Sequence, residues 1–146
     1  MLDYSIGMDL TKPESLLKDT YDLFICTQVF NFIYDMRAAI RGAFHLLKDK
    51  GTLLATVAGN ISPVSRSDME NYGHFWGFTY LAIRKLVSEV FGEDNVRVIP
   101  FGNSAAATAF IQGLSVEDLP DKSLLDDTDS DYAICIGIVA KKRVSA

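Results

Sequence analysis

Short apolar runs and amphipathic segments alternate along the first half of this chain. Leu23–Cys26 is an apolar run that is too short for a helix and rich in strand formers, so we expect a strand over 22–26. Residues 36–48 carry apolar side chains three and four positions apart, which predicts a helix with Asp35 as its N-cap. The run TLLATV at 52–57 is apolar on both faces and predicts a second strand, covered on both sides. Strand, helix and strand in this order form the βαβ unit of a parallel sheet, whose ligand sites lie at the carboxyl ends of the strands.

The second half of the chain predicts another amphipathic helix and two more strands. Thr79 caps a helix over Tyr80–Phe91, and Gly92 ends it. Pro100 favours an edge position for the strand expected over 95–101. The other expected elements are a weak strand Tyr4–Met8, a short helical turn Glu14–Leu17 after Pro13, an alanine-rich helix Ser104–Gln112 and a last, fully buried strand Tyr132–Ala140.

Residues 59–77 differ from the rest of the chain, because they mix glycine, proline, serine and asparagine with Tyr72, His74, Phe75 and Trp76. This composition predicts a long loop or a broken helix that follows a buried strand. Loops of this length in compact domains are usually functional. The loop and the polar residues that follow strand 22–26 are therefore the candidate site.

Composition narrows the class of protein. The chain has 146 residues, of which 49% are hydrophobic and 23% charged, so we expect one domain with a real core. A net charge of -5 and the lack of a basic face argue against a nucleic-acid partner. The apolar runs are too short to span a membrane, and no signal peptide is recognisable. Cys26 and Cys135 each lie in an apolar run, which favours a reduced, cytoplasmic protein over a disulfide-bonded one.

Five segments of the chain, taken in order, carry a resemblance to a known family. They are GMDLTKPESL, YDLFICTQVFNFIYD, FHLLKDKGTLLATVAG, SRSDMENYGHFWGFT and FGEDNVRVIPFGN. Together they resemble the later part of class I S-adenosylmethionine-dependent methyltransferases, most closely the bacterial group often found alongside sugar-transfer enzymes. The resemblance spans nearly the whole chain.

The resemblance implies an α/β fold, namely a partial Rossmann-like methyltransferase domain with flanking helices. The family's sheet has the strand order 3-2-1-4-5-7-6, with strand seven antiparallel. Tyr4–Met8 would be strand three, and the four later strands of this chain would form a mostly parallel sheet in the order four, five, seven, six. Nothing in the sequence corresponds to strands one and two or to the glycine-rich turn after strand one. Residues 1–146 are therefore expected to form a single truncated methyltransferase-like domain.

The resemblance also implies the adenine side of an S-adenosylmethionine site. Asp9 would accept a hydrogen bond from the adenine amino group, and Leu10 would pack on the adenine ring. Thr27 and Gln28, after strand four, would pass near the methionyl part of the cofactor. The alternative for Asp9 is a turn residue that binds the backbone beside Thr11, and the alternative for Thr27 and Gln28 is simple strand termination.

The 59–77 loop would face a small-molecule or sugar acceptor. Methyl transfer is an in-line displacement in which the enzyme mainly positions two reactants, so aromatic walls and one base can suffice. His74 is the candidate catalytic base, and Arg66, Tyr72 and Trp76 are candidate substrate-binding residues. The alternatives are a loop histidine bonded to the backbone, core or lid aromatic residues, and a surface pair of Arg66 with Asp68. We expect no metal site.

The missing strands would leave strand four with an open edge, and such an edge either aggregates or is paired. We expect strand four, or the segment Leu2–Leu10, to pair with its counterpart in a second copy and form a homodimer. Alternatively, Leu2–Leu10 covers the edge of its own chain. Three functions stay open: a methyltransferase or the C-terminal part of one, a catalytically inactive methyltransferase-like fragment that acts as a dimeric binding or scaffold module, and a different α/β enzyme such as a nucleotide-dependent reductase.

Overall fold

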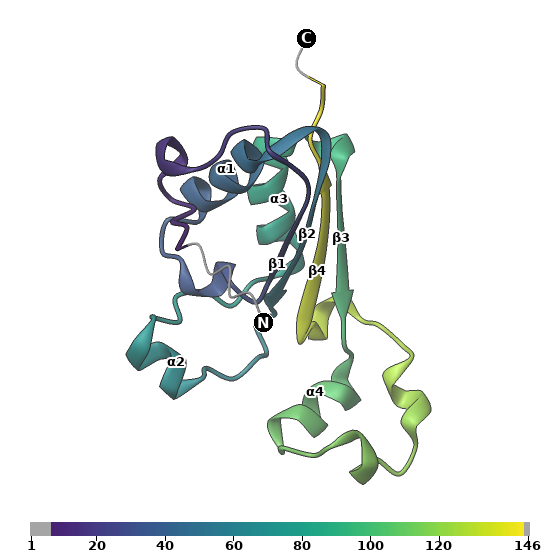
Figure 1. The fold of residues 1–146 in the computed structure, drawn as a ribbon. Coiled ribbons are helices and arrows are strands. Elements are labelled where there is room, and N and C mark those ends of the chain that lie inside the picture. Colours follow the sequence, from purple (N-terminus) through teal and green to yellow (C-terminus); the bar gives the residue numbers. More distant parts are fainter. Residues whose placement is uncertain (1–6, 145–146) are drawn as a thin grey trace, which may run out of the picture.

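One sheet and two helices packed on it form the body of the protein, and the computed structural model describes residues 7–144. The elements are β1 (Tyr21–Thr27), α1 (Met36–Leu46), β2 (Leu47–Ala58), α2 (Arg66–Asn71), α3 (Tyr80–Phe91), β3 (Val96–Phe101), α4 (Ser104–Ile111) and β4 (Cys135–Lys141), with short 3-10 turns between them. The sheet has the order β1-β2-β4-β3. Figure 1 shows that α1 and α3 lie on the same side of this sheet.

The sheet is mixed rather than mostly parallel. β1 pairs with β2 in parallel, whereas β4 is antiparallel to both β2 and β3. Three of the strands therefore run in one direction and β4 alone is reversed. The reason lies in the connection, because the chain leaves the end of β3 and returns beside it as β4. The expected mostly parallel sheet is corrected to one parallel and two antiparallel pairings.

Within the described part of the chain, β1 is an edge strand and the sheet has four strands. The seven-strand order implied by the resemblance is therefore present only in part. The expected strand Tyr4–Met8 falls mostly on residues 4–6, which lie outside the described residues, and Gly7 and Met8 are not in a strand. β3 lies at the opposite edge, as Pro100 predicts.

The boundary between α1 and β2 lies earlier than the sequence predicts. The helix expected over 36–48 stops before Leu47, which is already the first residue of β2. Leu47 is fully buried, and it packs in the core as the first residue of β2 rather than as part of the helix. An irregularity follows, since Tyr21 aligns with Leu47 but Leu23 aligns with Thr52. β2 therefore contains extra residues that β1 does not match.

Both long helices begin at the predicted caps. The Asp35 side chain accepts a hydrogen bond from the backbone N–H of Ala38 at 2.9 Å, and Thr79 accepts one from Ala82 at 3.2 Å. Gly92 ends α3 with a φ of 84°, in the left-handed region that favours glycine. These local signals fix where the two helices of the core start.

The two faces of the sheet differ in coverage. α1 and α3 cover one face, where Leu53 of β2 and Ile83 of α3 are fully buried. The described residues place no helix on the other face, so the prediction that 52–57 is covered on both sides is wrong. The exposed apolar residues of that open face include Leu23 (48%), Ile25 (61%) and Leu54 (36%).

The segment between β3 and β4 extends past the end of the sheet, as Figure 1 shows. It begins with α4, which ends one residue before the predicted Gln112. β4 begins at Cys135 and not at Tyr132, because Ser130–Tyr132 forms a 3-10 turn with Asp129 as its cap. In residues 7–144 no helix is long and apolar enough to cross a membrane.

A buried lysine joins the end of β4 to the helix layer. Lys142 is 5% exposed, and its Nζ donates to the Asp19 carboxylate at 2.7 Å. The same Nζ donates to the carbonyl oxygens of Phe44 and Leu47, at 3.0 and 2.7 Å, and lies 4.5 Å from the centroid of the Phe44 ring. The hydrogen bond from Lys142 lowers the pKa of Asp19.

Candidate functional site

The chain turns sharply at the carboxyl end of β1. Gln28 adopts a φ of 55°, and its backbone N–H donates to the carbonyl of Thr56 on β2 at 2.9 Å. Its side-chain Nε2 donates to Thr56 Oγ1 at 3.3 Å and approaches Cys135 Sγ at 3.5 Å. Gln28 therefore holds together the ends of β1, β2 and β4, which is the position where open α/β sheets bind ligands.

A cavity of about 300 Å³ opens beside this turn, along β1. Two of the residues predicted to bind the cofactor, Leu10 and Thr27, lie in its wall. Leu10 is only 7% exposed, whereas Thr27 is exposed. The structure thus brings together residues from the 9–10 segment and from the end of the strand. The full lining is Met8, Leu10, Phe24, Ile25, Cys26, Thr27 and Val29.

Gly42 of α1 makes the position of Leu10 possible. A Cβ atom at Gly42 would collide with the carbonyl group of Leu10. The segment that carries Leu10 can therefore lie directly against the helix only because residue 42 has no side chain. α1 supports one wall of the cavity in this way.

Asp9 lies next to this wall but is not part of the lining. Its carboxylate accepts hydrogen bonds from the backbone N–H and the hydroxyl of Thr11, at 2.9 and 2.6 Å, and forms an ion pair with Lys12 at 3.2 Å. The hydrogen bonds from Thr11 lower the pKa of Asp9. The carboxylate is thus ionised and forms the local turn that was the alternative interpretation of this residue.

The end of the 59–77 loop folds onto the segment that precedes α1. The rings of Tyr34 and Trp76 are stacked, with centroids 6.0 Å apart and planes at 24°. Trp76 is also stacked on Phe78 at 6.3 Å, and Phe75 meets Tyr34 edge-on at 5.4 Å. The Trp76 Nε1–H donates to the carbonyl of Ile33 at 3.0 Å, which fixes the indole ring.

Asn31 anchors this aromatic group to the sheet. It is 1% exposed, and its side-chain oxygen accepts a hydrogen bond from the backbone N–H of Ala58 at 3.2 Å. Its carbonyl accepts from the backbone N–H groups of Phe75 and Trp76, at 2.9 and 3.3 Å. Asn31 was not predicted from the sequence as a site residue, although a polar residue between Phe30 and Phe32 is a signal for a buried, hydrogen-bonded amide.

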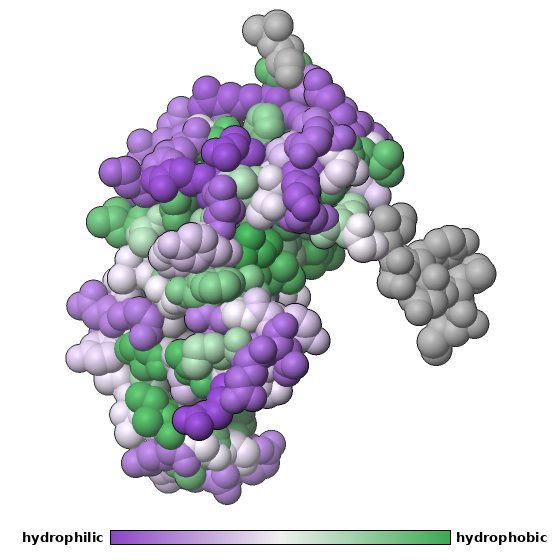
Figure 2. Space-filling model, turned by 90° about the vertical axis from the view of Figure 1, so that its left-hand side faces the viewer, coloured by the Kyte–Doolittle hydropathy of each residue, from purple (hydrophilic) through white to green (hydrophobic). Residues whose placement is uncertain are grey.

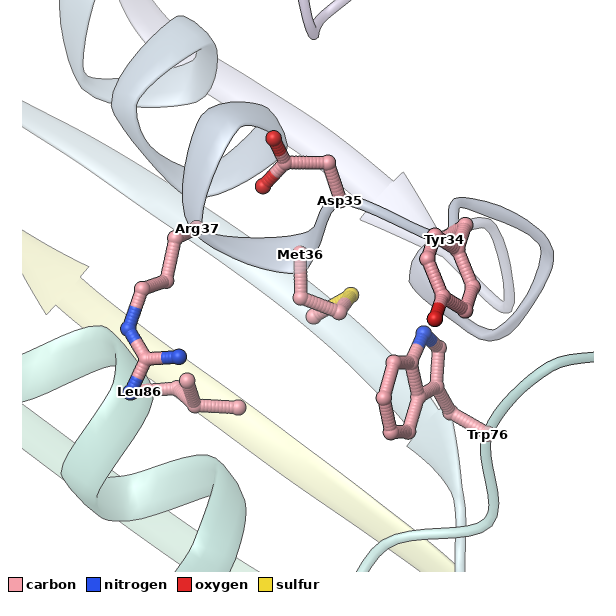
Figure 3. A pocket seen from close by; sticks show the side chains of 6 residues that line it. All are labelled: Tyr34, Asp35, Met36, Arg37, Trp76 and Leu86. Carbon is pink, nitrogen blue, oxygen red and sulfur yellow. The ribbon is translucent and has the colours of Figure 1, made fainter.

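A second cavity, of about 430 Å³, lies between the first turn of α1, the aromatic group and α3. Figure 3 shows Tyr34 and Trp76 at one end of it, Arg37 and Leu86 at the other, and Met36 between them. In Figure 2 the upper part of the visible face is mostly polar, and hydrophobic patches lie below it among polar ones. The lining is Tyr34, Asp35, Met36, Arg37, Trp76 and Leu86. Of the predicted substrate-binding residues, only Trp76 belongs to it.

His74, Tyr72 and Arg66 do not line either cavity. His74 packs edge-on against Phe32, with centroids 5.2 Å apart, and its Nδ1 is buried without a hydrogen-bond partner among the described residues. Tyr72 is 72% exposed. Arg66 is exposed on α2, and no ion pair joins it to Asp68. The structure does not bring these residues together.

The cysteines are poor candidates for nucleophiles. Cys26 and Cys135 are both free. Burial raises the pKa of Cys26 to about 12 and also raises the pKa of Cys135, so both thiols keep their protons at neutral pH. Over residues 7–144 no group of three or more histidine, cysteine, aspartate or glutamate side chains is placed to hold a metal ion.

No protein-family model matches the chain, and no curated protein matches it. Solved structures match it in fold. A SAM-dependent methyltransferase from Archaeoglobus fulgidus aligns with a TM-score of 0.57 at 10% identity, over 94% of this chain and 66% of that chain. A possible histamine N-methyltransferase from Thermotoga maritima aligns with a TM-score of 0.56 at 16% identity, over 88% and 59%. Phosphoethanolamine N-methyltransferase 2 of Haemonchus contortus, in complex with phosphomonomethylethanolamine and S-adenosylhomocysteine, aligns with a TM-score of 0.55 at 14% identity, over 89% and 35%.

The chain therefore has part of the class I fold of S-adenosylmethionine-dependent methyltransferases, as the sequence resemblance implies. At these identities the likeness concerns the fold alone. The chain spans between 35% and 66% of the length of these three structures. The bacterial, sugar-associated type stays a prediction.

Proposed function

We propose that this chain takes part in methyl transfer from S-adenosylmethionine to a small-molecule acceptor. The fold supports the proposal, and the observation that carries it is the cavity beside Leu10 and Thr27 at the carboxyl end of β1. Open α/β sheets bind their ligands at that end. Leu10, which the resemblance assigns to the adenine side, and Thr27, which it assigns to the methionyl side, thus line one cavity. A single domain, a cytoplasmic location and a sugar as the acceptor stay predictions.

The residues of this chain fit one part of the cofactor. Leu10 would pack on the adenine ring, and Asp9 would accept from its amino group, because an ionised carboxylate has more acceptor sites than its bonds to Thr11 and Lys12 use. Thr27 and Gln28 would lie toward the methionyl part. S-adenosylmethionine supplies an electrophilic methyl group on a sulfonium, so the chain's task is mainly to position and desolvate the reactants. His74 is our proposed base, and Arg66, Tyr72 and Trp76 our proposed acceptor contacts.

A thermal-shift titration with S-adenosylmethionine tests the proposal. A ligand at a hundred times its dissociation constant adds about 2.7 kcal/mol of stability. Thr27→Glu should abolish the shift, since it places a carboxylate in the cavity wall. Thr20→Glu is the matched control, because Thr20 lies just before β1, at the opposite end of the strand. No shift at millimolar cofactor with a folded protein would contradict cofactor binding by this chain.

A second function, a catalytically inactive module that binds as a homodimer, is favoured by the open edge of β1. The described residues supply no further strand to pair with β1, and Leu23 and Ile25 are exposed on the adjoining open face of the sheet. Two β1 strands paired around a two-fold axis would form one continuous sheet. The alternative cover, Leu2–Leu10, falls in part on residues 2–6, outside the described residues. Sedimentation that gives a monomer at micromolar concentration would contradict the dimer.

A further inference from the structure

The second cavity has the build of a ligand site. Its volume of about 430 Å³ falls within the usual range for small-molecule pockets. Its walls come from the segment before α1, the first turn of α1, the 59–77 loop and α3, which are far apart in the sequence. Met36, which is 5% exposed, and Leu86 form an apolar floor. Such a concave, mostly apolar hollow with few polar groups is typical of a binding site.

Aromatic faces dominate one end of this cavity. Tyr34 and Trp76 are stacked at 6.0 Å, and both lie in the lining. The indole ring is held by its hydrogen bond to Ile33 and by its stacking on Phe78, so it offers a fixed surface. The faces of tyrosine and tryptophan carry negative electrostatic potential and attract cations within about 6 Å.

One guanidinium and two carboxylates lie in or beside the cavity, and only one of the carboxylates forms an ion pair within the described part of the chain. Arg37 donates to both oxygens of Glu89 across the gap between α1 and α3, at 2.9 and 3.3 Å, so its charge is paired. Asp35 has no ion pair among the described residues, and the one hydrogen bond to its carboxylate there is the helix cap from Ala38. That cap fixes the carboxylate at the rim. The lining itself holds one acidic and one basic side chain, Asp35 and Arg37, and Glu89 adds a second carboxylate beside it.

We propose that the cavity lined by Tyr34, Asp35 and Trp76 binds a small organic cation, through the aromatic rings of Tyr34 and Trp76 and the Asp35 carboxylate. An anion would face Asp35 while Arg37 is engaged with Glu89. A sugar would not gain a donor from the indole, because the Trp76 Nε1–H is already donated to Ile33. The proposal that this cavity binds a cation stands by itself. The further step, that the cation is an amine that accepts the methyl group, rests on the methyltransferase function proposed above.

Trp76 makes the test direct, because it is the only tryptophan in the chain. We would follow its fluorescence while adding choline or, as the neutral isostere, 3,3-dimethylbutan-1-ol, at constant ionic strength. Choline should change the emission and saturate, and the isostere should bind at least tenfold more weakly. Equal binding of both compounds, or no change up to about 100 mM choline, would overturn the proposal.

Two pairs of variants separate the cation site from general damage. Asp35→Asn keeps a good N-cap while it removes the charge, so choline affinity should fall about tenfold with little loss of stability. Asp22→Asn, an acid on β1 outside the cavity, should leave affinity unchanged. Tyr34→Phe keeps the aromatic face and should bind nearly as well, whereas Tyr34→Leu should bind several-fold more weakly. An Asp35→Asn protein with unchanged affinity would contradict the carboxylate's role.

The same samples distinguish this proposal from the proposed function. If choline binds and S-adenosylmethionine produces no thermal shift, the cation site stands and methyl transfer by this chain is wrong. If the cofactor binds and choline does not, the function stands and the acceptor class is wrong. Saturating choline together with the cofactor's thermal shift supports both.

Discussion

The two faces of the sheet show how differently one strand can be used. On the covered face, Leu53 of β2 packs against the helices and is fully buried, while its neighbour Leu54 is 36% exposed on the open face. Both residues lie in one apolar run, so their chemistry is the same and only the surroundings differ. The comparison teaches that stability comes from the face with α1 and α3, and that the open face is available for contacts with other molecules.

The largest effect should come from the covered face. Leu53→Ala should destabilise the protein by about 2–5 kcal/mol, because it leaves a cavity in a packed core. The matched variant Leu54→Ala should cost clearly less. Chemical denaturation with comparison of the midpoints measures both changes. Equal losses would break the comparison and indicate that the open face is buried in solution.

The next largest loss of stability should come from replacing the buried Lys142. Lys142→Met would remove the Lys142 hydrogen bonds to the carbonyls of Phe44 and Leu47, and the Phe44 carbonyl would keep another donor, the backbone N–H of Leu47. The cost should be about 1–3 kcal/mol. Lys141→Met is the control, because Lys141 is exposed on the same strand, and it should change stability by less than about 0.5 kcal/mol. Thermal unfolding of both variants shows whether a lysine here stabilises the fold through its buried hydrogen bonds or through its charge alone.

A polar substitution on the open face should have a small effect on folding. Ile25→Thr keeps a strand-forming, β-branched residue and should change the stability of the monomer by less than about 0.5 kcal/mol. If the β1 edge forms a dimer, the same variant should weaken association in sedimentation at unchanged secondary structure. A large loss of monomer stability would show that the face is not open.

The smallest effect concerns pH. The hydrogen bond from Lys142 depresses the pKa of Asp19 in the folded state, so this carboxylate stabilises the fold above its unfolded pKa. That stabilisation is lost as the pH falls through the folded-state pKa. Asp19→Asn should therefore be less stable than the natural chain at neutral pH, and the difference should vanish well below about pH 4. In a Lys142→Met background the pH-dependent difference should disappear, and its persistence would contradict this pairing.

Local signals in the sequence predicted the elements well. Asp35, Thr79 and Gly92 act on the backbone within a few residues of themselves, so caps and ends could be predicted without the fold. Leu47 could not be assigned in this way, because an apolar residue at helical spacing also suits the start of a buried strand. The coverage of the 52–57 run was mispredicted since an apolar run does not reveal which partner lies on it.

The candidate site was harder to predict, because it forms through tertiary contacts. Leu10 and Thr27 were expected in one site, and they share a cavity. Trp76 was singled out, but its partner Tyr34 was not, since the two rings meet only when the loop folds back on the segment before α1. The resemblance to methyltransferases supplied the cofactor prediction, and no pattern of spacing in this chain would have supplied it.

Because Gly42 has no side chain, α1 can support a wall of one cavity while it lines the other. The first turn of this helix bounds the aromatic cavity, and its middle bears directly on the backbone of Leu10, which bounds the other hollow. The two cavities therefore depend in part on the same helix, and a side chain added at residue 42 would displace the Leu10 segment from it.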